Sequence, residues 1–222
     1  MDASLRSSAA HVLVVDVERP VPAPDDVHHL LRVLRLRDGE SVSVTDGAGR
    51  WRLCAVAGGN VEPVGVVHTE PPPAPTLTIA VAPPKGDRLE WLVAKCTEAG
   101  IDRIVLLDAE RSVVRWSGDR ALKQLARLRR VASEASMQSR RVWWPEIAGP
   151  VPAREMLDKS RPAEPGGRAV TAGDVGIAVG PEGGWSPTEL DGIDDTVSLG
   201  PHVLRVETAA VVATGLMIAA RA

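Results

Sequence analysis

The sequence contains no tyrosine and no phenylalanine, so its aromatic rings come from six tryptophans and five histidines. Any flat ligand ring that stacks on a large aromatic side chain must therefore use tryptophan, and Trp143, Trp144 and Trp185 are the candidates. Cysteine is almost as scarce. Cys54 and Cys96 lie far apart, with no Cys-x-x-Cys or Cys/His spacing, which argues against a zinc site or a disulfide framework. We expect no metal.

Charge and hydrophobicity exclude two further classes of protein. The formal charge of −3 and the pI of about 6.0 argue against a uniformly basic nucleic-acid binder but allow a local basic patch. The apolar carboxyl end, "AAVVATGLMIAA", is too short to span a membrane and is typical of a buried helix. The amino terminus lacks the pattern of a secretory signal, so we expect a cytoplasmic protein with no membrane partner.

A proline-rich segment, "TEPPPAPT" (69–76), divides the sequence into two regions. Upstream, residues 11–17 and 61–68 are predicted strands, and 41–56 is a predicted hairpin that turns at Asp46–Gly49. A helix is predicted in 25–40, with Asp25 or Asp26 as its cap. Residues 1–72 are therefore predicted to form a small β-barrel-like domain.

Downstream, predicted strands alternate with helices. The strands are 76–83, 101–108, 176–180 and 196–200, and the helices are 87–100, 119–141 and the carboxyl end. Near-continuous apolar strands in this rhythm predict an α/β domain over 73–222, with a parallel sheet covered on both faces. The Gly/Pro-rich segment 161–174 is predicted to be a mobile loop.

Two glycine-containing junctions follow predicted strands, "VGPEGG" (179–184) and "SLGPHVLRVETAA" (198–210). Ligands gather at the carboxyl ends of parallel strands, and glycine lets a ligand approach the main chain. Neither junction has the spacing of a dinucleotide-binding loop or a P-loop, which argues against those ligands. Either junction alone is explained by a tight turn. Because both carry a glutamate, Glu182 and Glu207, we interpret the pair as a ligand site.

Four segments together resemble the RsmE family of the SPOUT superfamily. They are "GPEGGWSPTE", "LGPHVLRVETAA", "KGDRLEWLVAKCTEAGI" and "RLRRVASEASMQSRRVWWPEI", and they span Lys85 to Ala210. "HHLLRVLRLRDGE" also resembles the amino-terminal module of this family. The chain departs from the family at "SSAAHVLVV", where an Arg-Phe pair usually precedes the first strand, and at Trp185, where phenylalanine is commoner.

The resemblance implies an enzyme that uses S-adenosylmethionine to methylate N3 of a uridine in small-subunit ribosomal RNA, uridine 1498 of 16S RNA. It also implies a PUA-like RNA-binding β-barrel domain, a SPOUT-type parallel sheet with a trefoil knot, and a homodimer. The partner is then 16S ribosomal RNA or the small ribosomal subunit. The implied cofactor-binding residues are Val179, Gly180, Pro181, Gly183, Gly184, Leu199, Gly200, Val203 and Leu204.

Methylation at uracil N3 requires loss of the N3 proton, so the site needs a base or a cationic group that stabilises the uracil anion. Arg205 is the candidate for the cationic role, and Glu182 or Glu207 is the candidate for the base. Each carboxylate has a structural alternative. Glu207 would stabilise the first turn of the last helix through the helix dipole, and Glu182 would form bonds within its loop.

Contact with RNA requires basic surface, because phosphate contacts dominate affinity. On the helix 119–141, spacing places Arg127, Arg130, Glu134, Gln138 and Arg141 on one face, opposite Leu125, Leu128, Ala132 and Ala135. A solvated face with Arg/Glu pairs is the alternative. The residues that we expect to contact RNA are Arg32, Arg35, Arg37, Lys85, Arg88, Arg130, Glu134, Gln138 and Arg140.

Two other functions remain open from the sequence. One is a SPOUT enzyme that modifies transfer RNA, for example at a ribose 2′-hydroxyl. The other is a non-catalytic RNA-binding assembly factor. The identity of the methylated nucleotide distinguishes the transfer-RNA enzyme from our interpretation. Binding of S-adenosylmethionine distinguishes a methyltransferase from the assembly factor.

Overall fold

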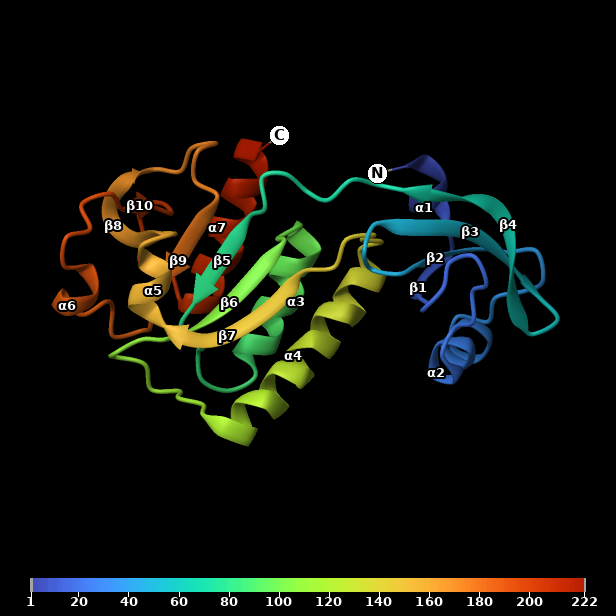
Figure 1. Cartoon of the computed structure of the whole chain (residues 1–222), viewed down its shortest axis with the longest axis horizontal. Helices are drawn as coiled ribbons and strands as arrows, with labels where there is room; N and C mark the ends of the chain where they lie inside the picture. The colour runs from blue at the N-terminus through green and yellow to red at the C-terminus, as the bar shows by residue number, and fades with distance from the viewer. Residues whose placement is uncertain (1, 222) are drawn as a thin grey trace. The chain divides into compact units, whose positions relative to one another are not determined.

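The computed structural model describes residues 2–221, and the chain forms two compact units. The first unit comprises the residues up to Pro73 together with Ser136–Trp144, and the second comprises the remainder. Figure 1 labels the helices and strands of both units.

The first unit contains one four-stranded sheet. A short helix, α1 (Ala3–Ser7), precedes strand β1 (Ala10–Leu13), and strands β2 (Ser41–Thr45), β3 (Arg50–Ala57) and β4 (Asn60–Thr69) complete the order β1-β2-β3-β4. β1 is parallel to β2, and the other pairs are antiparallel. The predicted hairpin is confirmed, since Asp46 Oδ1 accepts hydrogen bonds from the amides of Ala48 (2.8 Å) and Arg50 (3.1 Å) across its turn.

The helical segment of this unit differs from the prediction at its start. Helix α2 (Pro24–His28) runs into a π-helical turn, η1 (His29–Val33). The predicted cap at Asp25 or Asp26 is wrong: Ala23 occupies the cap position without a side-chain hydrogen bond. Pro24 begins the helix because its fixed φ suits the first helical position. Both aspartates lie in the first turn, where negative charge favours the helix dipole.

The second unit contains a six-stranded sheet in the order β10-β8-β9-β5-β6-β7, and every pairing is parallel. Its strands are β5 (Thr78–Val81), β6 (Arg103–Asp108), β7 (Glu146–Pro152), β8 (Arg161–Ala169), β9 (Gly176–Val179) and β10 (Val197–Ser198). The predicted α/β architecture with a parallel sheet is confirmed.

The prediction of a mobile loop at 161–174 is wrong, because β8 occupies most of it. β8 pairs with β9 only at Arg161 and Pro162, and with β10 only at Arg168 and Ala169. Because β8 pairs with each neighbouring strand over only two residues, few of its backbone amides have to donate hydrogen bonds. The strand can therefore contain prolines, which have no amide hydrogen, and glycines. Gly167 fits because a Cβ there would lie 2.7–2.8 Å from backbone atoms of Thr196 and Val197.

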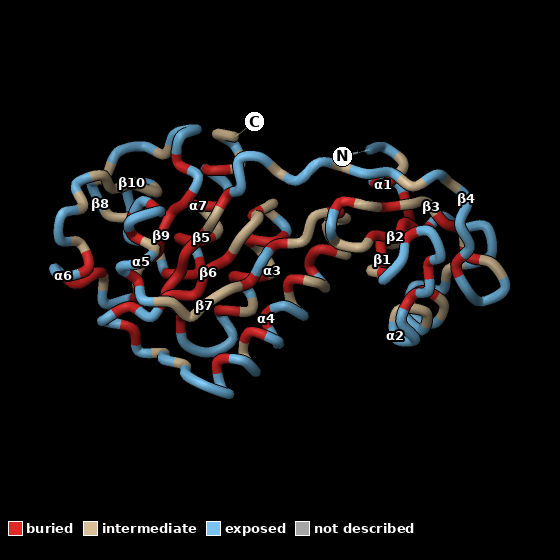
Figure 2. The backbone as a smooth tube through the Cα atoms, in the orientation of Figure 1, coloured by how far each residue is buried: buried red, intermediate tan, exposed pale blue. Residues whose placement is uncertain are grey.

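Helices cover both faces of this sheet (Figure 1). Helices α3 (Arg88–Ala99), α4 (Gly118–Gln138) and α7 (Val206–Arg221) pack on one face, and α5 (Ala153–Leu157) and α6 (Pro187–Leu190) contribute to the other. Figure 2 shows the resulting buried strands in red. The predicted apolar face of α4 is confirmed: Leu125, Leu128, Ala132 and Ala135 are all buried. Within residues 2–221, no helix is long and apolar enough to cross a membrane.

Candidate functional site

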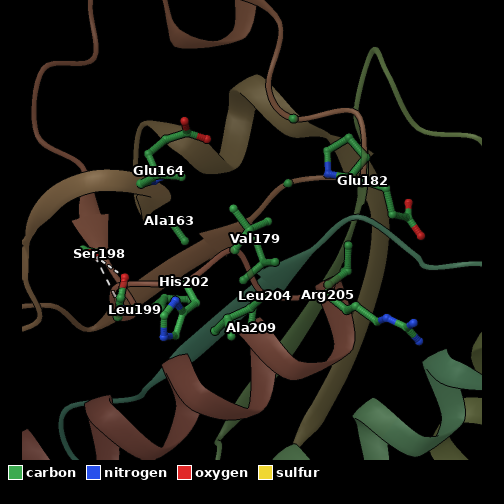
Figure 3. A pocket seen from close by; sticks show the side chains of 17 residues that line it. Ala163, Glu164, Val179, Glu182, Ser198, Leu199, His202, Leu204, Arg205 and Ala209 are labelled. Atoms are coloured by element: carbon green, nitrogen blue, oxygen red, sulfur yellow. Dashed lines mark hydrogen bonds between the residues drawn. The ribbon is translucent and has the colours of Figure 1, made fainter.

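A pocket of about 470 Å³ lies beyond the carboxyl ends of β9 and β10 (Figure 3). Three segments line it: 163–165 in β8, 179–184 after β9, and 198–209, which runs from β10 into α7. The two glycine-containing junctions, which are separate in sequence, therefore border one cavity.

Strand β8 makes room for the pocket between β9 and β10. It is paired with β9 at Pro162 and with β10 at Arg168, and it crosses from one neighbour to the other in between. The crossing residues Ala163, Glu164 and Pro165 line the cavity. Glu164 forms no hydrogen bond or ion pair with the described residues, and partial burial raises the pKa of its carboxyl group. The cavity thus has an uncompensated carboxyl group on the β8 side.

The glycines of the junctions have different roles. Gly184 (φ +69°) and Gly200 (φ +138°) line the pocket and have open space where a Cβ would point. A side chain would be strained at both positions, so glycine leaves the main chain exposed to the cavity. At Gly180, a Cβ would lie 2.9 Å from the indole of Trp185. Of the nine residues expected to bind the cofactor, only Gly183 does not border the pocket.

Trp185 packs against the first junction from the interior of the domain. Its side chain is buried, at 5% exposure, and its indole packs against Gly180. The expectation that Trp185 stacks on a base is therefore wrong, because its ring faces the protein interior. Trp143 and Trp144 are half-buried and pack on the turn of the first unit's hairpin, over Gly49 and Gly47, respectively. The Trp143 indole N–H also donates to the carbonyl of Glu70 (3.1 Å).

The first junction is fastened by residues that the sequence analysis missed. Ser186 and Glu189 form a capping box at the start of α6, and Glu189 Oε1 accepts a hydrogen bond from the amide of Glu110 (2.9 Å). Arg111 donates to the carbonyls of Gly183 and Trp185. The Ser-x-x-Glu spacing was a recognisable signal for the capping box. Arg111 had no such signal, because its partners lie far away in sequence.

Glu182 and Arg205 lie at one end of the pocket, and Ser198 and His202 lie at the other (Figure 3). Both charged side chains are exposed. The guanidinium of Arg205 forms no hydrogen bond or ion pair with any residue in 2–221. This end of the cavity therefore presents one carboxyl group and one guanidinium, and neither has a side-chain partner among the described residues.

Glu207 occupies a different environment. It lies in the first turn of α7, is 9% exposed, and does not line the pocket. Its Oε1 lies 3.8 Å from Nε of Arg88, and its Oε2 is buried without a hydrogen-bond partner among the described residues. Glu207 is therefore placed to stabilise the start of α7 and to pair with Arg88.

The residues expected to contact RNA are distributed over both units. Arg32, Arg35 and Arg37 are exposed in the first unit, and Lys85 and Arg88 are exposed around the start of α3. On α4, Arg130 and Glu134 are exposed and pair at 3.7 Å, as the alternative of a solvated face predicted, and Gln138 is also exposed. Arg140 instead donates to the carbonyl of Ser8 (2.6 Å) within the first unit.

Comparison with known families identifies both regions. The family described as "RNA methyltransferase domain" matches residues 70–218, and the family described as "RNA methyltransferase PUA domain" matches residues 22–60. The second match confirms the predicted PUA-like domain.

Curated relatives carry the same description. Ribosomal RNA small subunit methyltransferase E of Mycobacterium tuberculosis is 36% identical over 216 residues, covering 86% of this chain and 82% of the relative. The enzyme of the same name from Synechocystis is 32% identical, covering 92% of this chain and 76% of the relative.

Solved structures agree with these sequence matches. Ribosomal RNA small subunit methyltransferase E from Neisseria gonorrhoeae, bound to S-adenosyl methionine, is 28% identical with a TM-score of 0.75, covering 94% of this chain and 96% of that one. A probable rRNA-methyltransferase from Porphyromonas gingivalis is 29% identical with a TM-score of 0.75, covering 92% and 95%. The chain therefore belongs to the RNA methyltransferase family whose curated members are named ribosomal RNA small subunit methyltransferase E.

Proposed function

We propose that this protein uses S-adenosylmethionine to methylate N3 of a uridine in 16S ribosomal RNA, uridine 1498 in the numbering of that RNA. The observation that carries the proposal is the convergence of both glycine-containing junctions on one pocket, with Glu182 and Arg205 at one end. Membership of the family supports the reaction type, and the Neisseria relative supports the cofactor.

The pocket suits this cofactor. Its volume of about 470 Å³ lies within the roughly 300–1,000 Å³ of small-molecule sites. Val179, Leu199, Val203 and Leu204 supply apolar surface for a flat purine, and the main chain at Gly184 and Gly200 is open to polar edges. When bound, S-adenosylmethionine supplies an electrophilic methyl group on a positively charged sulfur. The carboxylates of Glu164 and Glu182 give the pocket a charge that complements a cation.

The chain's contribution to the reaction begins with orientation. A methyl transfer needs donor and acceptor in line, and a rigid pocket wall supplies much of that advantage. Here the wall is built on the buried strand β9 and on α7, with the indole of Trp185 packed beneath Gly180. The junction loops that line the pocket are therefore attached directly to core elements, which limits their movement.

We assign the proton transfer to Glu182 and the anion stabilisation to Arg205. Glu182 borders the pocket and has no internal partner, so its carboxylate is free to accept the N3 proton. The guanidinium of Arg205 would then donate to a uracil oxygen, where negative charge develops. Glu207 is the weaker candidate for the base, because it lies outside the pocket lining and next to Arg88.

RNA binding is assigned to the exposed basic residues of both units. Residues 1–72 supply Arg32, Arg35 and Arg37, and residues 73–222 supply Lys85, Arg88 and the exposed face of α4.

We also propose the homodimer and the trefoil knot that the family resemblance implies. Light scattering of the purified protein tests the dimer. The cytoplasmic location stays a prediction.

One experiment tests the function directly. Small-subunit RNA is prepared from cells that lack this protein, incubated with purified enzyme and S-adenosylmethionine, and digested for mass mapping. We expect one additional methyl group, on the base of uridine 1498. A methyl group on another nucleotide, on a ribose, or only on transfer RNA contradicts the assigned target. Absence of cofactor binding by calorimetry, with and without RNA, favours the non-catalytic assembly factor.

A further inference from the structure

The segment that follows β6 is bonded to the first glycine-containing junction. Nη1 of Arg111 donates to the carbonyl oxygens of Gly183 (3.1 Å) and Trp185 (3.0 Å). A Cβ at Gly183 would lie 3.3 Å from Cβ of Arg111, so the arginine packs directly against the loop. The amide of the preceding residue, Glu110, donates to Glu189 Oε1 (2.9 Å). One short segment therefore holds the middle and the carboxyl end of the loop, together with the helix α6 that follows it.

The bonded carbonyls flank Gly184, which is the part of the loop with open space toward the pocket. Gly184 has φ +69°, and its amide donates to the carbonyl of Pro181 (2.8 Å) to close a tight turn. Gly183 and Gly184 are adjacent, and a pair of glycines has more conformational freedom in the unfolded chain than any other pair of residues. This turn therefore needs hydrogen bonds from outside the loop to keep one conformation. The planar, permanently charged guanidinium of arginine suits carbonyls in a fixed arrangement.

We infer that Arg111 is a positioning residue for the cofactor pocket: it holds the loop 181–185 in the conformation in which Gly184 and Glu182 face the ligand. The inference rests on the proposed function, because it assumes that S-adenosylmethionine occupies the pocket described above. A loop fixed before binding does not have to be ordered by the ligand, and this raises affinity without a new contact. Arg111 itself does not line the pocket.

Arg115 provides a matched control. It belongs to the same segment and its Nη2 also donates to a main-chain carbonyl, that of Glu110 (2.8 Å). Its Nη1 lies 3.5 Å from the carboxylate of Asp108. A third partner is the carbonyl of Ala109 (3.5 Å), and none of the three lies in the 181–185 loop. Arg115→Ala therefore tests whether a general loosening of the segment after β6, rather than loss of the two bonds from Arg111, weakens binding.

The test compares Arg111→Ala, Arg111→Lys and Arg115→Ala by calorimetric titration with S-adenosylmethionine. We expect the Kd to rise about tenfold in Arg111→Ala and by less in Arg111→Lys, whose ammonium group keeps the charge and its donors but lacks the fixed planar geometry of the guanidinium. Arg115→Ala should bind like the wild type. Hydrogen exchange of the free proteins should be faster at Gly184, whose amide is bonded to Pro181, in Arg111→Ala only, a readout that a global loss of stability does not produce.

A wild-type Kd in Arg111→Ala, or an equal loss in Arg115→Ala, overturns the inference. If Arg111→Ala does not fold, Arg111→Lys provides the test. Unchanged cofactor affinity and unchanged hydrogen exchange in Arg111→Lys would also overturn the inference. Leu204→Ala separates this inference from the proposed function, because Leu204 lines the pocket and does not contact Arg111. Weaker binding in Leu204→Ala with unchanged binding in both Arg111 variants removes only the role of Arg111. Unchanged binding in Leu204→Ala removes the pocket assignment itself.

Discussion

Arg168 and Asp174 form a two-pronged ion pair, with Nη1–Oδ2 and Nη2–Oδ1 distances both 2.7 Å. The same guanidinium also bonds the carboxylate of Asp195, at 2.7 Å from Nε. Arg168 lies at the end of β8, Asp174 just before β9, and Asp195 just before β10. One side chain therefore links the three strands that frame the pocket.

This ion pair predicts a loss of stability at low pH. The hydrogen bonds from Arg168 hold the pKa of Asp174 well below its ordinary value. A carboxyl group with a lowered folded-state pKa contributes stability above its unfolded pKa, about 3.9, and loses it as pH falls below that value. We expect Asp174→Asn to lower the free energy of unfolding by about 2 kcal/mol at pH 7.

Urea unfolding at pH 7 and at pH 3 measures the effect. The difference between the wild type and Asp174→Asn should shrink at the lower pH, because Asp174 of the unfolded wild-type chain is then largely protonated while the ion pair keeps it charged in the folded protein. Asp195→Asn is the control: because Asp195 is 45% exposed, its loss should matter less. A difference that does not change with pH contradicts the assignment.

His11 predicts a second pH dependence, in a higher range. Its ring is buried, with Nδ1 2.8 Å from the hydroxyl oxygen of Ser43 and Nε2 3.1 Å from the carbonyl of Arg141. Burial lowers the pKa of His11 to about 4. Between that value and the unfolded pKa of about 6.5, the unfolded state binds more protons, so stability rises with pH. The total change in the free energy of unfolding is about 3 kcal/mol.

The measurement is urea unfolding from pH 4.5 to 7.5, for the wild type and His11→Gln. The slope of stability against pH in this interval should be smaller in the variant, because the group that titrates only in the unfolded state is gone. Equal slopes in the two proteins would show that His11 is not responsible. An NMR titration of the His11 ring checks the pKa independently.

Arg205→Ala should reduce turnover and leave assembly intact. The exposed guanidinium has no partner among residues 2–221, so its removal breaks no internal contact and the melting temperature should change little. Loss of one group that stabilises developing charge lowers kcat about 100-fold. Arg205→Lys should recover part of the loss, because it keeps the charge. Wild-type kcat in Arg205→Ala would remove this residue from the mechanism.

Glu182→Gln and Glu207→Gln distinguish the two candidate bases. If Glu182 accepts the N3 proton, its replacement lowers kcat about 100-fold or more, and part of the loss is recovered at high pH as more uracil ionises in solution. Glu207→Gln should chiefly lower stability, because its carboxylate lies beside Arg88 at the start of α7. Single-turnover rates between pH 6 and pH 9.5 make the comparison. The reverse pattern would identify Glu207 as the base.

Four of the six strands of the second unit and its main helices were predictable because local patterns specify them, whereas β7 was not predicted. The apolar runs at β5, β6 and β9 and the helical spacing of Leu89, Leu92, Val93 and Cys96 point to one structure whatever surrounds them. Strand β8 was not predictable. Its prolines and glycines read as a loop, and only the neighbouring strands β9 and β10 make an extended conformation favourable there.

By itself, the sequence determined the alternation of strands and helices, the two glycine-containing junctions and the family, since each depends on residue types at fixed spacing. The tertiary structure decided which residues meet. In the folded chain Trp185 packs against Gly180, and Glu207 forms an ion pair with Arg88 outside the pocket lining. Arg111 donates a hydrogen bond to the carbonyl of Gly183. Those contacts join residues far apart in the chain, and their existence depends on packing between elements, which no local pattern encodes.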